Sequence, residues 1–356
     1  MTAYLVNIAL LFAWAALLLW RTPDRQNRKL FCVFASLQWI ALSGLRHVSV
    51  GADTFAYKLH FERVLDTSWS DVLGGVWGTY FGPLELKDPG YAVFVKMTQV
   101  VSSDYQVYLI MIAMLFTIPL GIFIYRYSID PLLSFLIYSS LFYSFFAITG
   151  IRQTVATALV VFIGYRLIEL RRLVPFLLVV LVAFTLHKSS AVFLLFYPLS
   201  SLRLSARSAF ALLAGAVLAF MYRLELMQFL GVLSGYEQYA RQFQGAGAWV
   251  FGAMLLLVVT VALVRSAGLS REDAHVNASY NALLLALVFT PLTFVDPSAM
   301  RVVQYFSLFL MILVPSVVRS FRDPNERVLV SLVAASLLIF LFVTGNPQYL
   351  FFWQAL

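Results

Sequence analysis

Long apolar runs follow one another along the whole chain and are separated by short polar segments. A helix needs about 20 mostly apolar residues to cross a bilayer, so runs of this length predict membrane-spanning helices. The pattern predicts about twelve spans, at residues 2–20, 30–45, 104–125, 131–149, 152–170, 173–187, 189–203, 208–222, 248–265, 277–295, 302–318 and 328–345. We therefore expect an all-α fold, a polytopic transmembrane helical bundle. The runs 173–187 and 189–203 are short and adjoin, so a re-entrant pair is an alternative there.

The composition excludes a soluble protein. Of 356 residues, 62% are hydrophobic and 12% are charged, whereas soluble domains are about half apolar and a quarter charged. The polar segments are too small to fold separately, so we expect a single integral membrane domain over residues 1–356. The first run, Tyr4 to Trp20, has no basic segment before it and no cleavage site of small residues, which favours a retained helix over a signal peptide. The single cysteine, Cys32, excludes a disulfide and predicts a small core residue.

Lys and Arg are unevenly shared between the two sets of alternating loops, and this asymmetry predicts the orientation of the chain. Cytoplasmic loops of membrane proteins are enriched in Lys and Arg. One set of loops holds most of them, namely Arg21, Arg25, Arg28, Lys29, Arg126, Arg166, Arg171, Arg172, Arg203, Arg207, Arg265, Arg271, Arg319, Arg322 and Arg327. We expect this set to be cytoplasmic. The net charge of +8 then has a topological cause, and it does not indicate nucleic-acid binding.

The longest polar segment, residues 46–103, lies between the second and third predicted spans, on the side opposite the basic loops. It mixes aromatic residues, glycines and charges of both signs, which predicts an ordered extracytoplasmic cap. Its last part, Tyr91 to Val101, is helical in pattern but too short to span a bilayer, and it carries Lys96. We expect an interfacial or re-entrant helix there.

Two groups of polar residues precede the third span, also on the predicted outer side. Arg46 follows the second span and leads into Gly51-Ala52-Asp53-Thr54, with Tyr57 one turn further on. Asp53 can cap the following helix or contact a substrate, and both alternatives remain open. Asp88-Pro89-Gly90-Tyr91 opens the short helix, where Asp before Pro is typical of a helix start. We therefore expect Asp88 to be a cap.

Three cationic segments recur on the same predicted side further along the chain. Arg152-Gln153 begins a long apolar helix, where a cation opposes the helix dipole, so a functional role is favoured for Arg152. His187-Lys188 separates two apolar runs, and we again favour function. Arg301 begins a late span, with Tyr305 on the next turn; a salt bridge to Asp296 is the alternative role for Arg301.

Two further histidines, His60 in the cap and His275 in a predicted cytoplasmic loop, are expected to be solvated.

Four cations, Arg46, Arg152, Lys188 and Arg301, are thus predicted at one membrane face with few acidic partners. Such a cluster favours an anionic ligand. The guanidinium fork suits phosphate oxygens, and a diphosphate at the membrane surface needs several cations to offset its desolvation. A lipid-linked diphosphate fits these requirements.

These segments together resemble a known family. The resemblance rests on Arg46, Gly51-Ala52-Asp53-Thr54, Tyr57, Asp88-Pro89-Gly90-Tyr91, Ile151-Arg152-Gln153, Leu186-His187-Lys188-Ser189 and Arg301 through Tyr305-Phe306. In this order they resemble the EpsG-like branch of bacterial Wzy-type polysaccharide polymerases, over most of the chain. One departure is Asp88, where the family's usual residue is Glu.

The resemblance implies a GT-C-like membrane glycosyltransferase that joins undecaprenyl-diphosphate-linked repeat units of O-antigen, capsule or exopolysaccharide. It implies a multi-pass protein of the bacterial cytoplasmic (inner) membrane with its active site facing outwards. Donor and acceptor are both lipid-linked glycans, and a chain-length regulator and a flippase are candidate partners. We expect no cofactor and no metal, because the sequence has no Asp-x-Asp motif and no histidine-rich cluster.

The residues then take the following roles. We expect Arg152 to stabilise the leaving diphosphate, and His187, or else Asp53, to accept the proton of the acceptor hydroxyl. The expected substrate-binding residues are Arg46, Tyr57, Asp88, Tyr91, Gln153, Lys188, Arg301 and Tyr305.

Two other functions are considered. A lipid-linked oligosaccharide flippase should show related halves and polar groups along a path through the membrane, which the sequence does not show. A membrane acyltransferase would need donor access from the cytoplasmic side, where His187 is not expected.

Overall fold

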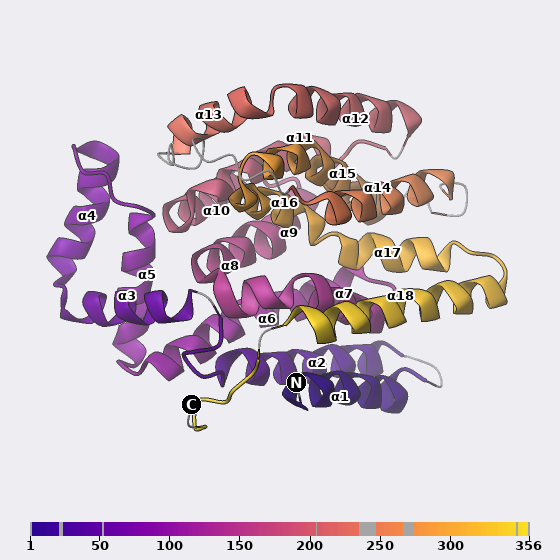
Figure 1. Cartoon of the computed structure of the whole chain (residues 1–356), viewed down its shortest axis with the longest axis horizontal. Helices are drawn as coiled ribbons and strands as arrows, with labels where there is room; N and C mark the ends of the chain where they lie inside the picture. The colour runs from indigo at the N-terminus through magenta and orange to yellow at the C-terminus, as the bar shows by residue number, and fades with distance from the viewer. Residues whose placement is uncertain are drawn as a thin grey trace. The chain divides into compact units, whose positions relative to one another are not determined.

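The computed structural model describes residues 2–20, 24–51, 53–203, 205–234, 247–265, 269, 273–346 and 348–354. Arg21 and Arg271 of the predicted basic loops and Ala52 of the predicted cap lie outside these residues. The described residues form helices joined by short connections, and the one isolated β-bridge joins Arg46 to Phe351. The all-α prediction is confirmed for this part of the chain (Figure 1).

The chain divides into two compact units. Unit 1 comprises residues 1–188 and 332–356, and unit 2 comprises residues 189–331. The helices of unit 1 are α1 (Thr2–Leu18), α2 (Arg25–Gly44), α3 (Thr54–Asp66), α4 (Trp69–Phe81), α5 (Pro89–Val101), α6 (Tyr105–Tyr127), α7 (Pro131–Leu141), α8 (Ile151–Thr157), α9 (Gly164–Glu169), α10 (Leu173–Leu186) and the second half of α18 (Pro324–Gly345). Single π-helical turns at Ser144–Thr149 and Ala158–Ile163 flank α8.

Unit 2 begins within a 3₁₀ helix, Lys188–Leu195. It continues with α11 (Phe196–Leu199), α12 (Ala206–Met221), α13 (Arg223–Ser234), α14 (Trp249–Val264), α15 (Ala274–Phe289), α16 (Met300–Ser307), α17 (Leu310–Arg319) and the first half of α18. Here α15 is the central helix, buried over most of its length and packed against α12, α14, α16 and α17.

Helices begin where short polar side chains can accept bonds from free backbone N–H groups. Asp24 accepts from the N–H of Asn27 at the start of α2, and Asp104 accepts from that of Gln106 at the start of α6, both at 2.6 Å. Along their length α2 and α6 pack closely. A Cβ on Gly121 would lie 2.1 Å from Ser36 Oγ, so a larger residue there would require the Ser36 side chain to rotate away.

Each predicted span contains helix, but the count of about twelve spans is not shown. Among the described residues, four helical stretches are long and apolar enough to cross a membrane, at Tyr105–Tyr127, Ile151–Glu169, Ala274–Phe294 and Pro324–Gly345. Two bent pairs raise the number to six: α12 with α13, bent by 82°, and Pro297–Ser307 with α17, bent by 53°. The predicted span 302–318 is therefore broken after Ser307. The predicted span 131–149 is also interrupted, because α7 ends at Leu141 before the π-helical turn.

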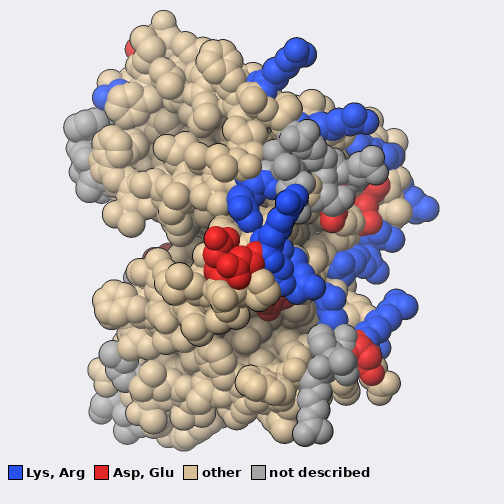
Figure 2. Space-filling model, turned by 90° about the vertical axis from the view of Figure 1, so that its right-hand side faces the viewer, with Lys and Arg blue, Asp and Glu red and all other residues tan. Residues whose placement is uncertain are grey.

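The basic loops of unit 1 lie together at one end of its helices. Arg28 Nη2 donates to the carbonyl of Ser128 at 2.6 Å, and Tyr127 donates to Glu169 at 2.6 Å. These bonds join the first turn of α2 to the α6–α7 connection, and the end of α6 to the end of α9. Figure 2, which looks onto the side of Figure 1 where α1 and α2 connect, shows Lys and Arg gathered there and broad uncharged surface around them. In unit 2, Arg265 likewise donates to the carbonyl of Ser320, at 2.9 Å.

The segment predicted as a cap folds as α3, α4 and α5, which pack against one another (Figure 1). The short helix expected at 91–101 is α5, which begins at Pro89 and ends at Val101. It also contacts α6 and α10. Cys32 is buried in α2, as expected of a small core residue.

Candidate functional site

Asp88 is the centre of the candidate site in unit 1. Its side chain is fully buried, and three groups surround its carboxylate. Arg152 Nη1 lies 3.0 Å from Oδ2, His187 Nδ1 lies 3.3 Å from the same oxygen, and the backbone N–H of Lys188 donates to Oδ1 at 3.3 Å. Four residues from three of the predicted segments are thus in contact.

The prediction that Asp88 caps α5 is wrong. Its side chain makes no capping hydrogen bond, and its backbone is left-handed, with φ of 50° and ψ of 58°. A capping residue normally has an extended backbone, which directs its side chain toward the first N–H groups of the helix. The left-handed backbone accompanies a different arrangement, in which the carboxylate contacts the start of α8 and the end of α10.

Gly90 allows this approach of α5 to α10. A Cβ on Gly90 would lie 2.3 Å from Thr185 Oγ1 and 2.9 Å from the backbone of Thr185. Any larger residue would push the start of α5 away from the end of α10. The motif Asp88-Pro89-Gly90-Tyr91 therefore places a carboxylate beside His187 because its third residue has no side chain.

Arg152 is the second residue of α8, after Ile151, and its side chain is 26% exposed. The expectation that the outer cations have few acidic partners is wrong for Arg152, which pairs with Asp88. Its guanidinium carbon also lies 6.0 Å from the centre of the Tyr91 ring. Arg152 thus borders both the carboxylate and an aromatic wall.

Tyr91 connects the cluster to the cap. Its ring stacks on that of His60 at 5.3 Å and meets Tyr57 edge-on at 6.0 Å, and its hydroxyl lies 2.6 Å from that of Tyr108. His60 was expected to be solvated, which is wrong, because it is partly buried against Tyr91. The sequence spacing offered a signal for this packing, because His60 follows Tyr57 by three residues and therefore lies on the same side of α3.

Burial lowers the pKa of His60, and the positive charges of Arg152 and Arg63 lower it further. Its imidazole is therefore held neutral in the range where an ordinary histidine begins to gain a proton. Among the described residues, His60 Nε2 has no hydrogen-bond partner although it is buried.

Tyr80 of α4 also borders the site and was not predicted. Burial and the nearby charge of Asp88 raise the pKa of its hydroxyl. This hydroxyl is buried and has no hydrogen-bond partner within the described part of the chain. The cap thus contributes an imidazole and a phenol to the surroundings of Asp88 and Arg152.

Arg46 is fully buried after the end of α2, where its main chain bridges to Phe351. Its Nη1 donates to the carbonyl of Ser43, whereas Nε and Nη2 are buried without a partner among the described residues. Burial lowers the pKa of Arg46, and the neighbouring tyrosines include Tyr105 and Tyr349. The sequence did not predict that the C-terminal segment would lie beside Arg46.

Asp53 was open to two interpretations, and the capping one is wrong. Its side chain is exposed and makes no capping hydrogen bond. Thr54 instead anchors the start of α3, because its hydroxyl donates to the carbonyl of Val50 at 2.7 Å. Gln153, the neighbour of Arg152, is buried.

The two remaining predicted residues belong to unit 2. Arg301 and Tyr305 lie on α16, and the buried Tyr305 hydroxyl is 3.1 Å from Ser189 Oγ. Asp296, the alternative partner of Arg301, accepts from the N–H of Ser298 at 2.7 Å. The convergence of Arg301 with the cations of unit 1 remains a prediction.

Within the described residues, no three His, Cys, Asp or Glu side chains lie together as a metal site requires. Metal independence itself remains a prediction.

The described fold is that of an all-α, multi-pass membrane protein in which a buried Asp contacts a partly exposed Arg and a buried His at the ends of helices. The family model of the EpsG family matches residues 29–351, so the chain belongs to the EpsG family, in the context of polysaccharide biosynthesis. No curated protein and no solved structure matches the chain.

Proposed function

We propose that this protein is a membrane glycosyltransferase that polymerises lipid-linked oligosaccharide repeat units. The main support for the proposal is the buried Asp88 carboxylate. Its Oδ2 contacts Arg152 and His187, and its Oδ1 accepts from the backbone N–H of Lys188. A cation can stabilise the diphosphate that leaves and an imidazole can accept the proton of the hydroxyl, so the two groups suit a transfer from a diphosphate to a hydroxyl. Membership of the EpsG family supports the same reaction.

The transfer breaks one bond and forms another. The bond between the sugar C1 and the diphosphate oxygen of the donor breaks, and the oxygen keeps the electron pair. The acceptor hydroxyl on a second lipid-linked repeat forms the new glycosidic bond and gives up its proton. Negative charge develops on the leaving diphosphate, which Arg152 and Lys188 stabilise as cations already in place.

His187 accepts the proton. An ionised Asp88 can only accept hydrogen bonds, so His187 Nδ1 carries the hydrogen in their 3.3 Å contact. The second ring nitrogen, Nε2, is then the basic one. This arrangement favours His187 over Asp53, which is exposed and forms no cap. Roles for Arg46 and Arg301 in binding the diphosphate are also part of the proposal.

The distribution of basic residues supports an outward-facing site in the bacterial cytoplasmic membrane. The basic loops of unit 1 lie at one end of α2, α6 and α9. Arg152 begins the stretch that ends at Glu169, and Asp88 contacts Arg152. The proposed site would therefore face away from the basic loops. Because cytoplasmic loops are enriched in Lys and Arg, the basic loops are assigned to the cytoplasm and the site to the outer side.

The test is reconstitution of the purified protein in liposomes with an undecaprenyl-diphosphate-linked repeat unit and excess chelator. We expect a ladder of glycan lengths on a gel. The alternative function is a lipid-linked oligosaccharide flippase. Transport of the lipid-linked sugar across the bilayer without any ladder would contradict the polymerase and favour the flippase.

A further inference from the structure

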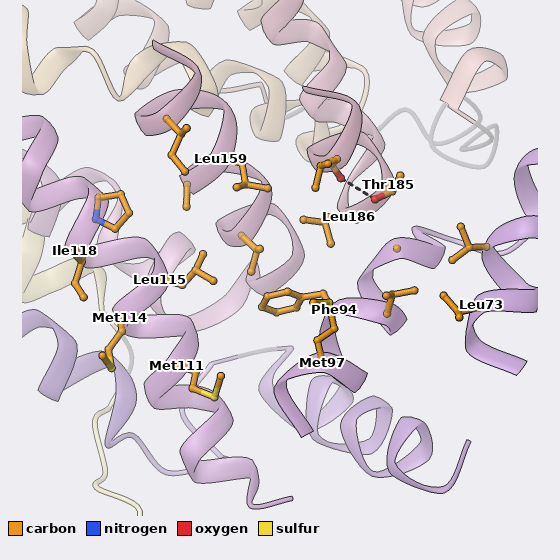
Figure 3. A pocket seen from close by; sticks show the side chains of 18 residues that line it. Leu73, Phe94, Met97, Met111, Met114, Leu115, Ile118, Leu159, Thr185 and Leu186 are labelled. Atoms are coloured by element: carbon orange, nitrogen blue, oxygen red, sulfur yellow. Dashed lines mark hydrogen bonds between the residues drawn. The ribbon is translucent and has the colours of Figure 1, made fainter. Parts of the chain in front are cut away.

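An apolar groove of about 900 Å³ lies within unit 1. Its walls come from α4, α5, α6, α10 and the helical stretch 151–163. Figure 3 shows Leu115 and Met111 of α6, Leu159 above them, and Phe94 and Met97 of α5 directed into the same space. The polar member of the lining is Thr185, whose hydroxyl already donates to the carbonyl of Val182 at 2.8 Å.

The groove follows helix faces over several turns. The lining residues on α6 include Met111, Met114, Leu115 and Ile118, at spacings of three and four. This spacing places them on one side of the helix over about 10 Å. The groove is thus elongated along α6, as a chain-like ligand requires.

The floor of the groove is buried and its rim is exposed. Val155 and Ala158 are almost fully buried, whereas Met97 is 60% exposed and Met114 is 43% exposed. An exposed apolar rim is suited to contact with lipid, so a lipid chain can enter the groove from the side.

One end of the groove meets the polar cluster. Gly90 lines the groove two residues after Asp88, and Leu186 lines it directly before His187. Val155 lines it one turn after Arg152. The apolar groove and the candidate catalytic groups are therefore continuous at the ends of α5, α8 and α10.

We propose that this groove holds the isoprenoid chain of the lipid-linked substrate, with its diphosphate at the Arg152 and Lys188 end. The inference rests on the proposed function and adds the path of the lipid. An amphiphile with an anionic head matches a groove that is apolar along α6 and cationic where it meets Arg152. Three methionines, Met97, Met111 and Met114, suit a methyl-branched chain, because their flexible side chains adapt to irregular shapes.

The test uses substitutions that fill the groove with large side chains from two facing walls. The double variant Leu115→Trp/Leu159→Trp places large rings in it, and the matched control Ile122→Trp/Leu178→Trp places the same rings on exposed positions of α6 and α10 outside the lining. Binding of undecaprenyl diphosphate and of geranyl diphosphate is measured in nanodiscs. The groove variant should bind undecaprenyl diphosphate about tenfold more weakly. Its affinity for geranyl diphosphate and both affinities of the control should be unchanged.

A second measurement applies if the groove variant fails to fold. The wild-type protein is cross-linked with undecaprenyl diphosphate that carries a photoreactive group in its chain, and the labelled peptides are identified. Labelling of the α6 peptide around Met114 is expected. Labelling confined to other helices, or displacement of the probe by phosphatidylglycerol alone, would overturn the groove as an isoprenoid site.

The two proposals fail in different ways. If the groove variant loses affinity for undecaprenyl diphosphate while the wild type makes no ladder, the groove stands and the polymerase does not. If the wild type makes a ladder and the groove variant binds the lipid as tightly, the polymerase stands and the groove does not.

Discussion

Arg152 Nη1 lies 3.0 Å from Asp88 Oδ2, an ion pair between two residues 64 positions apart. Asp88 is fully buried and Arg152 is partly exposed, so one partner is fixed and the other can meet a substrate. His187 shares the same carboxylate oxygen. Asp88 therefore has a positioning role for both residues, which makes it the first target for substitution.

Replacing Asp88 by Asn removes the charge and keeps the shape. Arg152 then lacks this acidic partner, so the unfolding free energy should fall by about 2 kcal/mol, and polymer formation should be lost. Asp88→Glu keeps the charge and should retain polymer formation at a reduced rate. Thermal unfolding in detergent and the glycan ladder measure the two effects. An Asn variant as active as the wild type would rule out the positioning role.

Arg152 should control the protonation of His60. Burial lowers the pKa of His60 first, and the charge of Arg152 lowers it further, so Arg152→Ala should raise this pKa part of the way toward the ordinary value of about 6.5. NMR of ring-labelled histidine, assigned with His60→Gln, measures the change. A His60 pKa that does not move in the Ala variant would contradict the proximity of the two side chains.

The same lowered pKa has a consequence for stability. An unfolded chain binds a proton at His60 more readily than the folded one, so the unfolding free energy should fall as pH drops from about 6.5 through the folded-state pKa. Wild type and His60→Gln are compared by thermal unfolding across this range. The wild type should lose more stability at the acidic end, and parallel curves would contradict the prediction.

Replacing Arg46 should leave the thermal stability unchanged or higher but reduce polymer formation. It is fully buried, and its Nε and Nη2 have no partner within the described residues. Burial of unsatisfied charged groups is costly, so Arg46→Met should unfold at the same or a higher temperature. Polymer formation should nevertheless fall. A marked loss of thermal stability would instead give Arg46 a structural role.

Gly51 should be indispensable for the start of the cap. Its φ is +106°, and a Cβ would lie 2.4 Å from the side chain of Ile148, just before Gly150 and Arg152. Gly51→Ala should therefore destabilise the protein by about 2 kcal/mol or more. The control is Gly74→Ala in α4, where a Cβ meets nothing within 4 Å. This change should stabilise by about 0.5 kcal/mol, because glycine is unfavourable within a helix.

Helices and polar segments could be predicted from the sequence because they depend on local patterns. The contact between Asp88 and His187 could not, since it joins residues 99 positions apart and depends on the close approach of Gly90 to Thr185. The dipeptide Asp88-Pro89 predicts a cap because it is typical of helix starts, and the left-handed backbone of Asp88 is not visible in that pattern. The environment of Arg46 was missed for a similar reason, because Phe351 lies at the other end of the chain.

The most direct test of the account compares two arginines of one helical stretch. Arg152 pairs with Asp88 at the candidate site, and Arg166 pairs with Glu169 near the other end of the stretch Ile151–Glu169. Each is replaced by Ala, and the glycan ladder is measured in liposomes at equal protein content. We predict that Arg152→Ala abolishes the ladder while Arg166→Ala leaves it within about twofold of the wild type, because the partly exposed Arg166–Glu169 pair lies away from the candidate site. A normal ladder from Arg152→Ala would remove Arg152 from the site and contradict the proposed centre.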